Sequence, residues 1–502
     1  MFNLDRMMHS ISIWVVSVFL LLVLSFLLLI KTKTHNKKLP PGPPKLPLLG
    51  HLHLIGSLPH RSLWKLSRKY GPIMLLRLGS DPTIVISSAA AAREVLQVHD
   101  LVCCSRPLLA ASARFSYNFL DIGLSPYTDH WREVRKISVL ELFNARRVQS
   151  FHLIREEVSL LLKTIAQASS LAIPVDLSEE SYTLTANMIT RIAFGKRFGG
   201  GELDNGNFQQ LIRRAIAALG SFSMTDFFPS VGWIIDRLSG VNGRLEKSFA
   251  ELDAFFRQVV EGTSQNEENI VDVLLEMERD HSELDDALQL TRDCIKAIIM
   301  DIFIAGVNPG AGTIIWVMAE LVKNPKVTKK LQHEIRSYIK EDLVKENDLE
   351  KLQYLKMVVK EVLRLHPPAP LLLPRETMTH FKLKGYDIDP KTHLHINVWA
   401  IGRDPNYWTC PEEFLPERFM GSNIDYKGQN FELLPFGAGR RICPGMNMGI
   451  VTMELALANL LLQFNWKLPD GMKEEDMDME EDAGLTIAKK SPLKLIPIAY
   501  RP

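Results

Sequence analysis

Cys443 lies in the segment Phe436–Gly445, where residue types and spacing point most directly to chemistry. The segment reads F-x-x-G-x-R-x-C-x-G. Glycine and proline around the cysteine predict a tight turn that fixes the sulfur in place. The apolar run from Met446 to Leu462 predicts a helix that begins just after this turn.

A sulfur held in this way suits one kind of metal chemistry. Backbone N–H groups at a helix N-terminus stabilise a thiolate and lower the pKa of the cysteine. Such a thiolate suits the axial position on haem iron, where it favours O–O cleavage, and Arg441 is placed to pair with a haem propionate. A buried structural cysteine is the alternative for a lone residue, but the number and order of the fixed residues favour the ligand.

Composition limits what surrounds this segment. The 502 residues are enough for one large domain, and the formal net charge of +1 gives no argument for nucleic acid as a partner. Five cysteines in so long a chain fit a reducing compartment and not a disulfide framework.

The N-terminal segment predicts a membrane anchor. Residues 11–30 carry no charge and are long enough to cross a bilayer as one helix. Four lysines at 31, 33, 37 and 38 follow, so the positive-inside rule places the body in the cytosol. A cleaved signal peptide is the alternative, although it would have a shorter apolar region and basic residues before it. We expect residues 1–30 to form the lumenal N-terminus and anchor, 31–47 a basic, proline-rich hinge, and 48–502 the catalytic domain.

The body reads as mainly α with small β-sheets. Residues 73–78 and 83–87 predict two strands joined by a turn, and short strands return near Leu383, at 394–398 and at 493–498. The acidic run 473–482 reads as a solvated loop. The helical pattern covers residues 89–98, 150–167, 207–219, 243–261 and 288–323.

The Cys443 segment resembles the haem-binding signature of the cytochrome P450 family. This resemblance implies a haem-thiolate fold, haem b as the cofactor with Phe436 and Arg441 beside it, and electrons from NADPH-cytochrome P450 reductase. The proline hinge and the sequence style are similar to microsomal enzymes of plant specialised metabolism, the A-type group. This implies attachment to the endoplasmic reticulum membrane, with the single catalytic domain in the cytosol.

Two further motifs follow the family's order. Glu361 and Arg364 lie three residues apart on one predicted helix face, an ordinary surface pair by themselves. With Arg418 they match the family's buried charge network. Such a network fixes one chain geometry and does not necessarily stabilise it.

Trp131 and Arg135 share a helix face and are both donors suited to a carboxylate. A basic amphipathic helix with a core tryptophan is the alternative. The resemblance assigns both residues to the haem propionates, and Arg106 and Arg375 to positions nearby.

The chain departs from the family in its oxygen-activation motif. The usual acid is Asn308 here, the usual alcohol is Pro309, and Gly310 takes the next hydroxyl position. Asn308 cannot ionise, and Pro309 has no side-chain donor. Proline also removes the N–H that the Ala305 carbonyl would accept, so a local kink is expected. A water, Thr313 or a substrate hydroxyl would be the compensating donor.

Three functions fit these residues. The first is an NADPH-dependent monooxygenase or oxidase that acts on a small lipophilic substrate. The second is a haem-thiolate dehydratase or isomerase that needs no dioxygen, which Pro309 suggests. The third is a membrane-anchored haem-binding scaffold, against which the complete set of motifs argues. Apolar residues at the family's pocket positions favour a terpenoid, alkaloid or phenolic scaffold over a charged metabolite, with core packing as the alternative for each: Ala110, Leu120, Phe303, Val307, Ala369, Leu372 and Leu485.

Overall fold

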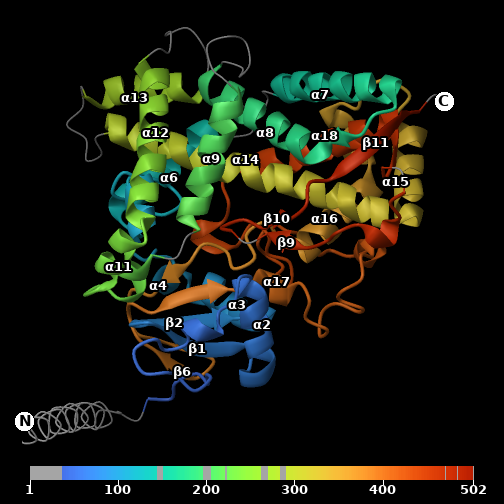
Figure 1. Ribbon diagram of the computed structural model, residues 1–502. Helices are drawn as coiled ribbons and strands as arrows, with labels where there is room; N and C mark the ends of the chain where they lie inside the picture. Colours follow the sequence, from blue (N-terminus) through green and yellow to red (C-terminus); the bar gives the residue numbers. More distant parts are fainter. Residues whose placement is uncertain are drawn as a thin grey trace, which may run out of the picture.

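The computed structural model describes residues 37–143, 151–195, 205–220, 223–261, 269–282, 290–469, 471–482 and 484–500. Helices make up most of this part of the chain, and the small sheets lie apart from one another, one toward the bottom of Figure 1 and another near the C-terminus. The predicted membrane segment 11–30 lies outside the described residues. The mainly α class with small sheets is confirmed.

The helices carry the bulk of the molecule, and their bounds are as follows. They are α2 (Pro59–Tyr70), α3 (Ala89–Arg93), α4 (Asp100–Cys103), α5 (Ala110–Phe115), α6 (Asp129–Ile137), α7 (Phe151–Leu171), α8 (Leu177–Phe194), α9 (Asn205–Leu219), α10 (Met224–Phe227), α11 (Gly232–Leu238), α12 (Val241–Glu261), α13 (Ile270–Ser282), α14 (Arg292–Lys323), α15 (Pro325–Tyr338), α16 (Gln353–Leu365), α17 (Val398–Ile401) and α18 (Met446–Gln463).

The strands form one four-stranded sheet and three smaller ones. The larger sheet has the order β1-β2-β7-β4, and β8 and β3 flank β11 in the three-stranded sheet. The strands are β1 (Ile73–Leu78), β2 (Asp81–Ile86), β3 (Val175–Asp176), β4 (Arg375–Glu376), β5 (Phe381–Leu383), β6 (Tyr386–Ile388), β7 (His393–Ile396), β8 (Phe464–Lys467), β9 (Glu481–Asp482), β10 (Ala488–Lys489) and β11 (Lys494–Ala499).

Local sequence accounts for several of these elements. The predicted hairpin forms, with Ile73 opposite Ile86 in an antiparallel pair, and Gly79 takes the left-handed conformation that its turn requires. The predicted helix at 89–98 is divided, because α3 ends at Arg93 and a π-helical turn continues to Val98.

Helix α14 runs through the middle of the molecule and joins its two largest hydrophobic clusters (Figure 1). Its first half, to Val307, packs with α8, α9, α12 and α13, and its second half, from Ile314, packs with α7, α15, α16 and α18. Among the described residues, α14 and α18 are apolar enough to cross a bilayer, but most of each lies inside the protein, as expected of core helices. The stretch between the two clusters contains Pro309 and Thr313.

Candidate active site

A cavity of about 330 Å³ lies beside this central stretch of α14. Its wall combines one face of α14, the start of α18, the segment 122–124 and the segment 368–373. Cys443 and four of the arginines that the sequence singled out also line it: Arg106, Arg135, Arg375 and Arg441. The fold therefore brings most of the predicted haem contacts to one cavity.

The turn that carries Cys443 depends on glycine. Gly437 and Gly439 both have positive φ angles, of 70° and 71°. A Cβ at Gly439 would come within 2.4 Å of the Leu96 carbonyl oxygen, so no other residue fits there. The Cys443 N–H donates to the carbonyl of Phe436 at 3.0 Å, and Phe436 also lines the cavity.

Helix α18 begins at Met446, just after the sulfur, as the sequence predicts. The lowering of the thiol pKa expected from the helix start is wrong for the surroundings that the chain itself provides. Burial raises the pKa of Cys443, and the Gly445 N–H and the charge of Arg135 lower it without reversing the effect. A coordinated metal ion deprotonates a thiol outright, so Cys443 still fits the role of a ligand.

The cavity arginines find mainly backbone carbonyls as partners. Arg441 donates to the carbonyls of Cys104 and Ser125, and Arg106 donates to those of Gly123, Leu373 and Pro374. Burial lowers the pKa of Arg441 to about 9.

Burial also lowers the pKa of Arg106 and of Arg135, and the charges of Arg441 and Arg375 add to the effect at Arg106. Neutral carbonyls do not offset the charge of a buried guanidinium, whereas carboxylates would. The two propionates of haem b therefore fit this wall.

Arg375 differs because it has a carboxylate of its own. Its guanidinium meets Asp100 at 2.9 Å, and Asp100 also accepts from the backbone N–H of Arg440 at 2.9 Å. Asp100 is buried and joins α4 to the cysteine-bearing turn. Sequence reasoning missed this residue, because an isolated aspartate on a short helix gives no signal of its own.

Trp131 lies outside the residues that line the cavity. Its indole N–H donates to the carbonyl of Ile122 at 2.8 Å, and its ring lies 3.7 Å from the guanidinium carbon of Arg441. The indole therefore supports Arg441, and its N–H is already engaged. Direct contact of Trp131 with a propionate stays a prediction.

Helix α14 turns Pro309 and Thr313 toward the cavity. The Thr313 hydroxyl donates to the Pro309 carbonyl at 2.8 Å, and the helix continues through the proline. Asn308 lies outside the cavity wall, with a buried side-chain oxygen that has no hydrogen-bond partner in the described structure. The expected kink is thus small enough to keep the helix continuous.

Three of the predicted pocket residues line the cavity: Ala369, Leu372 and Leu485. Phe303 and Val307 do not, which corrects the expectation. Both lie on the face of α14 that packs into the hydrophobic core, where Phe303 stacks on Phe194 with ring centres 5.1 Å apart. Ala110 and Leu120 also lie outside the cavity wall. Ala305 and Gly306 occupy the positions on α14 that face the space.

The charge network of Glu361, Arg364 and Arg418 forms behind the site. Arg364 meets both carboxylate oxygens of Glu361 at 2.8 Å, and Arg418 meets one of them at 2.9 Å. Glu361 and Arg364 are fully buried. Arg364 also donates to the carbonyls of Gly402 and Pro411, both at 2.6 Å, so one side chain ties α16 to two distant loops.

Comparison with known proteins agrees with this geometry. The sequence profile described as Cytochrome P450 matches residues 40–495. Cytochrome P450 71B26 of Arabidopsis thaliana is 51% identical over 97% of this chain and 99% of its own length. Cytochrome P450 71B34 and Cytochrome P450 71B37 of the same plant are 49% and 50% identical over the same shares. The chain belongs to the cytochrome P450 family, as a monooxygenase of the plant A-type group that uses haem b and electrons from a redox partner.

Proposed function

We propose that this monooxygenase oxidises a small lipophilic specialised metabolite of terpenoid, alkaloid or phenolic type. It uses dioxygen and electrons from NADPH-cytochrome P450 reductase. The cavity carries the proposal, because aliphatic and aromatic side chains form most of its wall beside Cys443 and the four arginines. An apolar wall with few polar groups selects a substrate by shape and orients it through one or two hydrogen bonds.

In this proposal Cys443 would supply the thiolate ligand of the haem iron, and Arg106, Arg135, Arg375 and Arg441 would hold the propionates. The haem, when bound, supplies oxidative chemistry that its thiolate ligand favours. The chain contributes the fixed sulfur, the buried positive charge and a cavity wall that excludes water. Phe436 contributes both to this wall and to the turn that positions the sulfur.

The chain's own residues also have to move protons without the usual acid and alcohol. Pro309 gives the Ala305 carbonyl no N–H, and Ala305 is exposed to the cavity. This carbonyl is a polar group suited to hold a water in the wall, and the Thr313 hydroxyl, which donates to the Pro309 carbonyl, lies about two helical turns further along α14. We propose that Thr313, with such a water, takes the place of the acid and alcohol. No feature of the described residues favours the oxygen-independent dehydratase or isomerase over this route.

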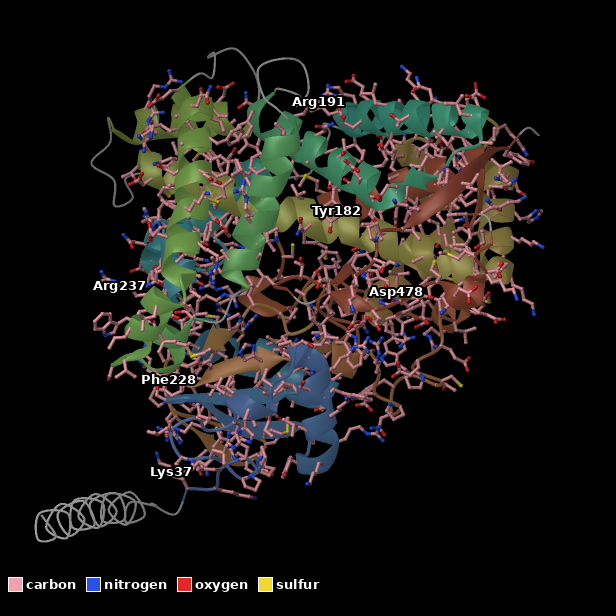
Figure 2. The ribbon with its side chains drawn as sticks, viewed as in Figure 1. Lys37, Tyr182, Arg191, Phe228, Arg237 and Asp478 are labelled. Atoms are coloured by element: carbon pink, nitrogen blue, oxygen red, sulfur yellow. The ribbon has the colours of Figure 1, made fainter. Side chains whose placement is uncertain are left out.

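We further propose that residues 1–30 anchor the protein in the endoplasmic reticulum membrane, with the basic hinge 31–47 leading to a cytosolic catalytic domain. Exposed apolar side chains support this, with Trp233 and Leu238 of α11 at 50% and 83% exposure and Leu48 at 85%. The turn after β1 connects the segment of Leu48 to the segment that precedes α11. The Gly79 N–H donates to the Leu49 carbonyl, and the Ser80 N–H donates to the Phe227 carbonyl. In Figure 2, Lys37, Phe228 and Arg237 lie toward the same side of the molecule.

Reconstitution tests the reaction. The protein is combined with candidate apolar substrates, with and without NADPH and the reductase, in air and without oxygen. Product that forms only when NADPH, the reductase and oxygen are all present supports the proposal, and turnover without oxygen would contradict it. Protease added to intact microsomes should digest the body, whereas full protection would reverse the proposed topology.

A further inference from the structure

Asp301 is an acidic residue within an apolar stretch of α14, between Met300 and Ile302, and it lines the cavity. One of its carboxylate oxygens accepts the backbone N–H groups of Ile122 and Gly123, at 2.7 and 2.9 Å. A Cβ at Gly123 would lie 3.2 Å from its other oxygen, so the loop backbone lies close against this carboxyl group. Asp301 thus binds the segment 119–125 to α14.

Asp121 is the second acid of this contact. It accepts the Leu124 N–H at 2.8 Å and the Ser125 hydroxyl at 2.7 Å, and its carboxyl group lies beside that of Asp301. Two carboxylates held side by side against the same loop repel each other, and burial strengthens the repulsion, so one of the two groups carries a proton. Burial raises the pKa of both groups, and the charge of Asp121 raises that of Asp301 further.

The segment 119–125 also contacts the arginines of the cavity. The Gly123 carbonyl accepts from Arg106 at 2.9 Å, and the Ser125 carbonyl accepts from Arg441 at 2.7 Å. The same segment supplies Ile122, Gly123 and Leu124 to the cavity wall. One short stretch of backbone therefore contributes to the cavity wall and accepts hydrogen bonds from two of the arginines in that wall.

The positive charges near Asp121 and Asp301 determine which of the two carboxyl groups is more easily ionised. The charges of Arg106 and Arg441 lie close enough to Asp121 for each to affect the other's ionisation. Arg135 is the cation near Asp301, and the thiol of Cys294, near Asp121, donates to the Leu120 carbonyl at 3.5 Å. Asp121 has two cations beside it where Asp301 has one, so the negative charge is more stable on Asp121, while the two groups titrate as one pair with a single proton.

We propose that Asp121 and Asp301 share one proton and act as a positioning pair, which holds the segment 119–125 so that it sets both the pocket wall and the orientation of Arg106 and Arg441. The orientation of Arg106 and Arg441 toward a ligand rests on the proposed propionate contacts. The shared proton and the position of the segment 119–125 do not depend on those contacts.

The proton is tested by infrared spectroscopy at pH 8. The carboxyls of Asp226 and Glu454, whose pKa values burial raises to about 6 and about 7, are then mostly ionised. The spectrum of the wild type minus that of Asp301→Asn should contain the C=O band of a buried protonated carboxylic acid. The control Asp293→Asn, at an exposed position on the same helix, should leave the band in place. Absence of the band from the wild type would overturn the shared proton, and this measurement does not depend on the haem.

Positioning is tested with two probe ligands, imidazole and 4-phenylimidazole, by their absorption difference spectra. Imidazole reports the iron site, and the phenyl group adds a report of the apolar wall. The measured quantity is the affinity for 4-phenylimidazole divided by the affinity for imidazole. Asp301→Asn keeps an acceptor for both N–H groups, so this affinity ratio should match that of the wild type. Asp301→Leu leaves two buried N–H groups unpaired and should lower the ratio at least about tenfold. An unchanged ratio in Asp301→Leu would overturn the positioning role.

The same samples separate this inference from the proposed function. A normal reduced carbon monoxide band in Asp301→Asn shows that the haem-thiolate centre is intact. Loss of that band from the wild type would contradict the proposed function and leave the infrared result standing. Should Asp301→Leu not fold, a ratio in Asp301→Asn that falls about tenfold, although its acceptor is kept, would equally overturn the positioning role.

Discussion

Gly306 of α14 lies so close to Ile189 of α8 that a side chain at position 306 would have to displace the Ile189 side chain. A Cβ at Gly306 would lie 2.6 Å from the Ile189 Cδ1 atom, and one at Gly310 would lie 3.2 Å from Thr185 Cγ2. The two glycines flank Pro309 and let α14 and α8 pack closely where the proline interrupts the hydrogen bonds of the helix. Gly310, which replaces a family hydroxyl, therefore serves helix packing.

Filling this contact should destabilise the protein. Gly306→Val places a branched side chain against Ile189, and overpacking of this kind costs about 1–3 kcal/mol. Gly312→Ala is the control on the same helix, since its Cβ would meet only the Ile487 carbonyl oxygen, at 3.7 Å. Urea unfolding should show a loss for Gly306→Val, none for Gly312→Ala, and partial recovery when Ile189→Ala is added. Equal stability of the two glycine variants would contradict the packing role.

Restoring the family's acid and alcohol should change the coupling of NADPH consumption to product formation. The double variant Asn308→Asp with Pro309→Thr returns an ionisable group and a hydroxyl to α14. The fraction of NADPH consumption that forms product, or the ratio of products, should shift. Peroxide release and product ratios are measured on both forms with the same substrate. Identical coupling and products in both would mean that Pro309 is a tolerated irregularity and that the water at Ala305 is sufficient.

Cys443→Ala should abolish the reduced carbon monoxide band typical of thiolate-ligated haem, because the sulfur ligand is lost. Cys410→Ala is the matched control, since Cys410 is exposed. It should keep the band. A normal band in Cys443→Ala would disprove the ligand assignment.

Removing one member of the buried charge network should impair folding around the haem. Glu361→Ala leaves Arg364 and Arg418 without their carboxylate, and breaking a buried pair costs about 3–5 kcal/mol. Haem content per protein after expression should fall sharply. Asp129→Ala removes the exposed partner of Arg132 and should cost about 0–1 kcal/mol. A haem-replete, stable Glu361→Ala with only an altered rate would assign Glu361 to chemistry instead.

Sequence reasoning succeeded where a motif is local and failed where the partner is distant. The Cys443 turn and the Glu361–Arg364 pair follow from spacing within one turn or helix, and the structure forms both. The inward face of α14 depends on how α8 and α12 pack, so Ala305 faces the cavity where Phe303 was expected. Sequence reasoning also missed Asp301, although a charge within an apolar helix is a signal that could have found it. Its partner Asp121 lies 180 residues earlier, beyond the reach of any periodicity.

Glu481 is a second such case, in the acidic run 473–482 that the sequence predicted to be a solvated loop. The exposed part of that run fits the prediction, but Glu481 is buried and meets His60 at 2.9 Å and Arg61 at 2.7 Å. Trp399 also donates to it, at 3.3 Å. These contacts tie α2 to the strand β9, four residues before Leu485 in the cavity wall. The sequence of an acidic run does not show which of its residues will pair with cations from a distant helix.

The contact makes stability depend on pH in a defined direction. Burial raises the pKa of Glu481, but its hydrogen bonds and ion pairs with His60 and Arg61 outweigh this and lower the pKa from 4.5 to about 2. A lowered folded-state pKa contributes stability above the unfolded value, and that stability is lost as the pH falls from about 4.5 toward about 2. At about 1.4 kcal/mol per pKa unit the contribution is at most roughly 3.5 kcal/mol, and solvent screening at the half-exposed Arg61 reduces it.

Glu481→Gln should therefore lower stability at pH 7, and its deficit relative to the wild type should shrink below about pH 4.5. Glu475→Gln, at an exposed position in the same run, should match the wild type throughout. The apparent unfolding midpoint of all three proteins is measured from pH 7 to pH 3.5. Because β9 leads into the cavity wall, Glu481→Gln should also weaken 4-phenylimidazole binding relative to imidazole at pH 7. A deficit that stays constant to pH 3.5 would mean that Glu481 contributes through shape and hydrogen bonding, and not through its charge.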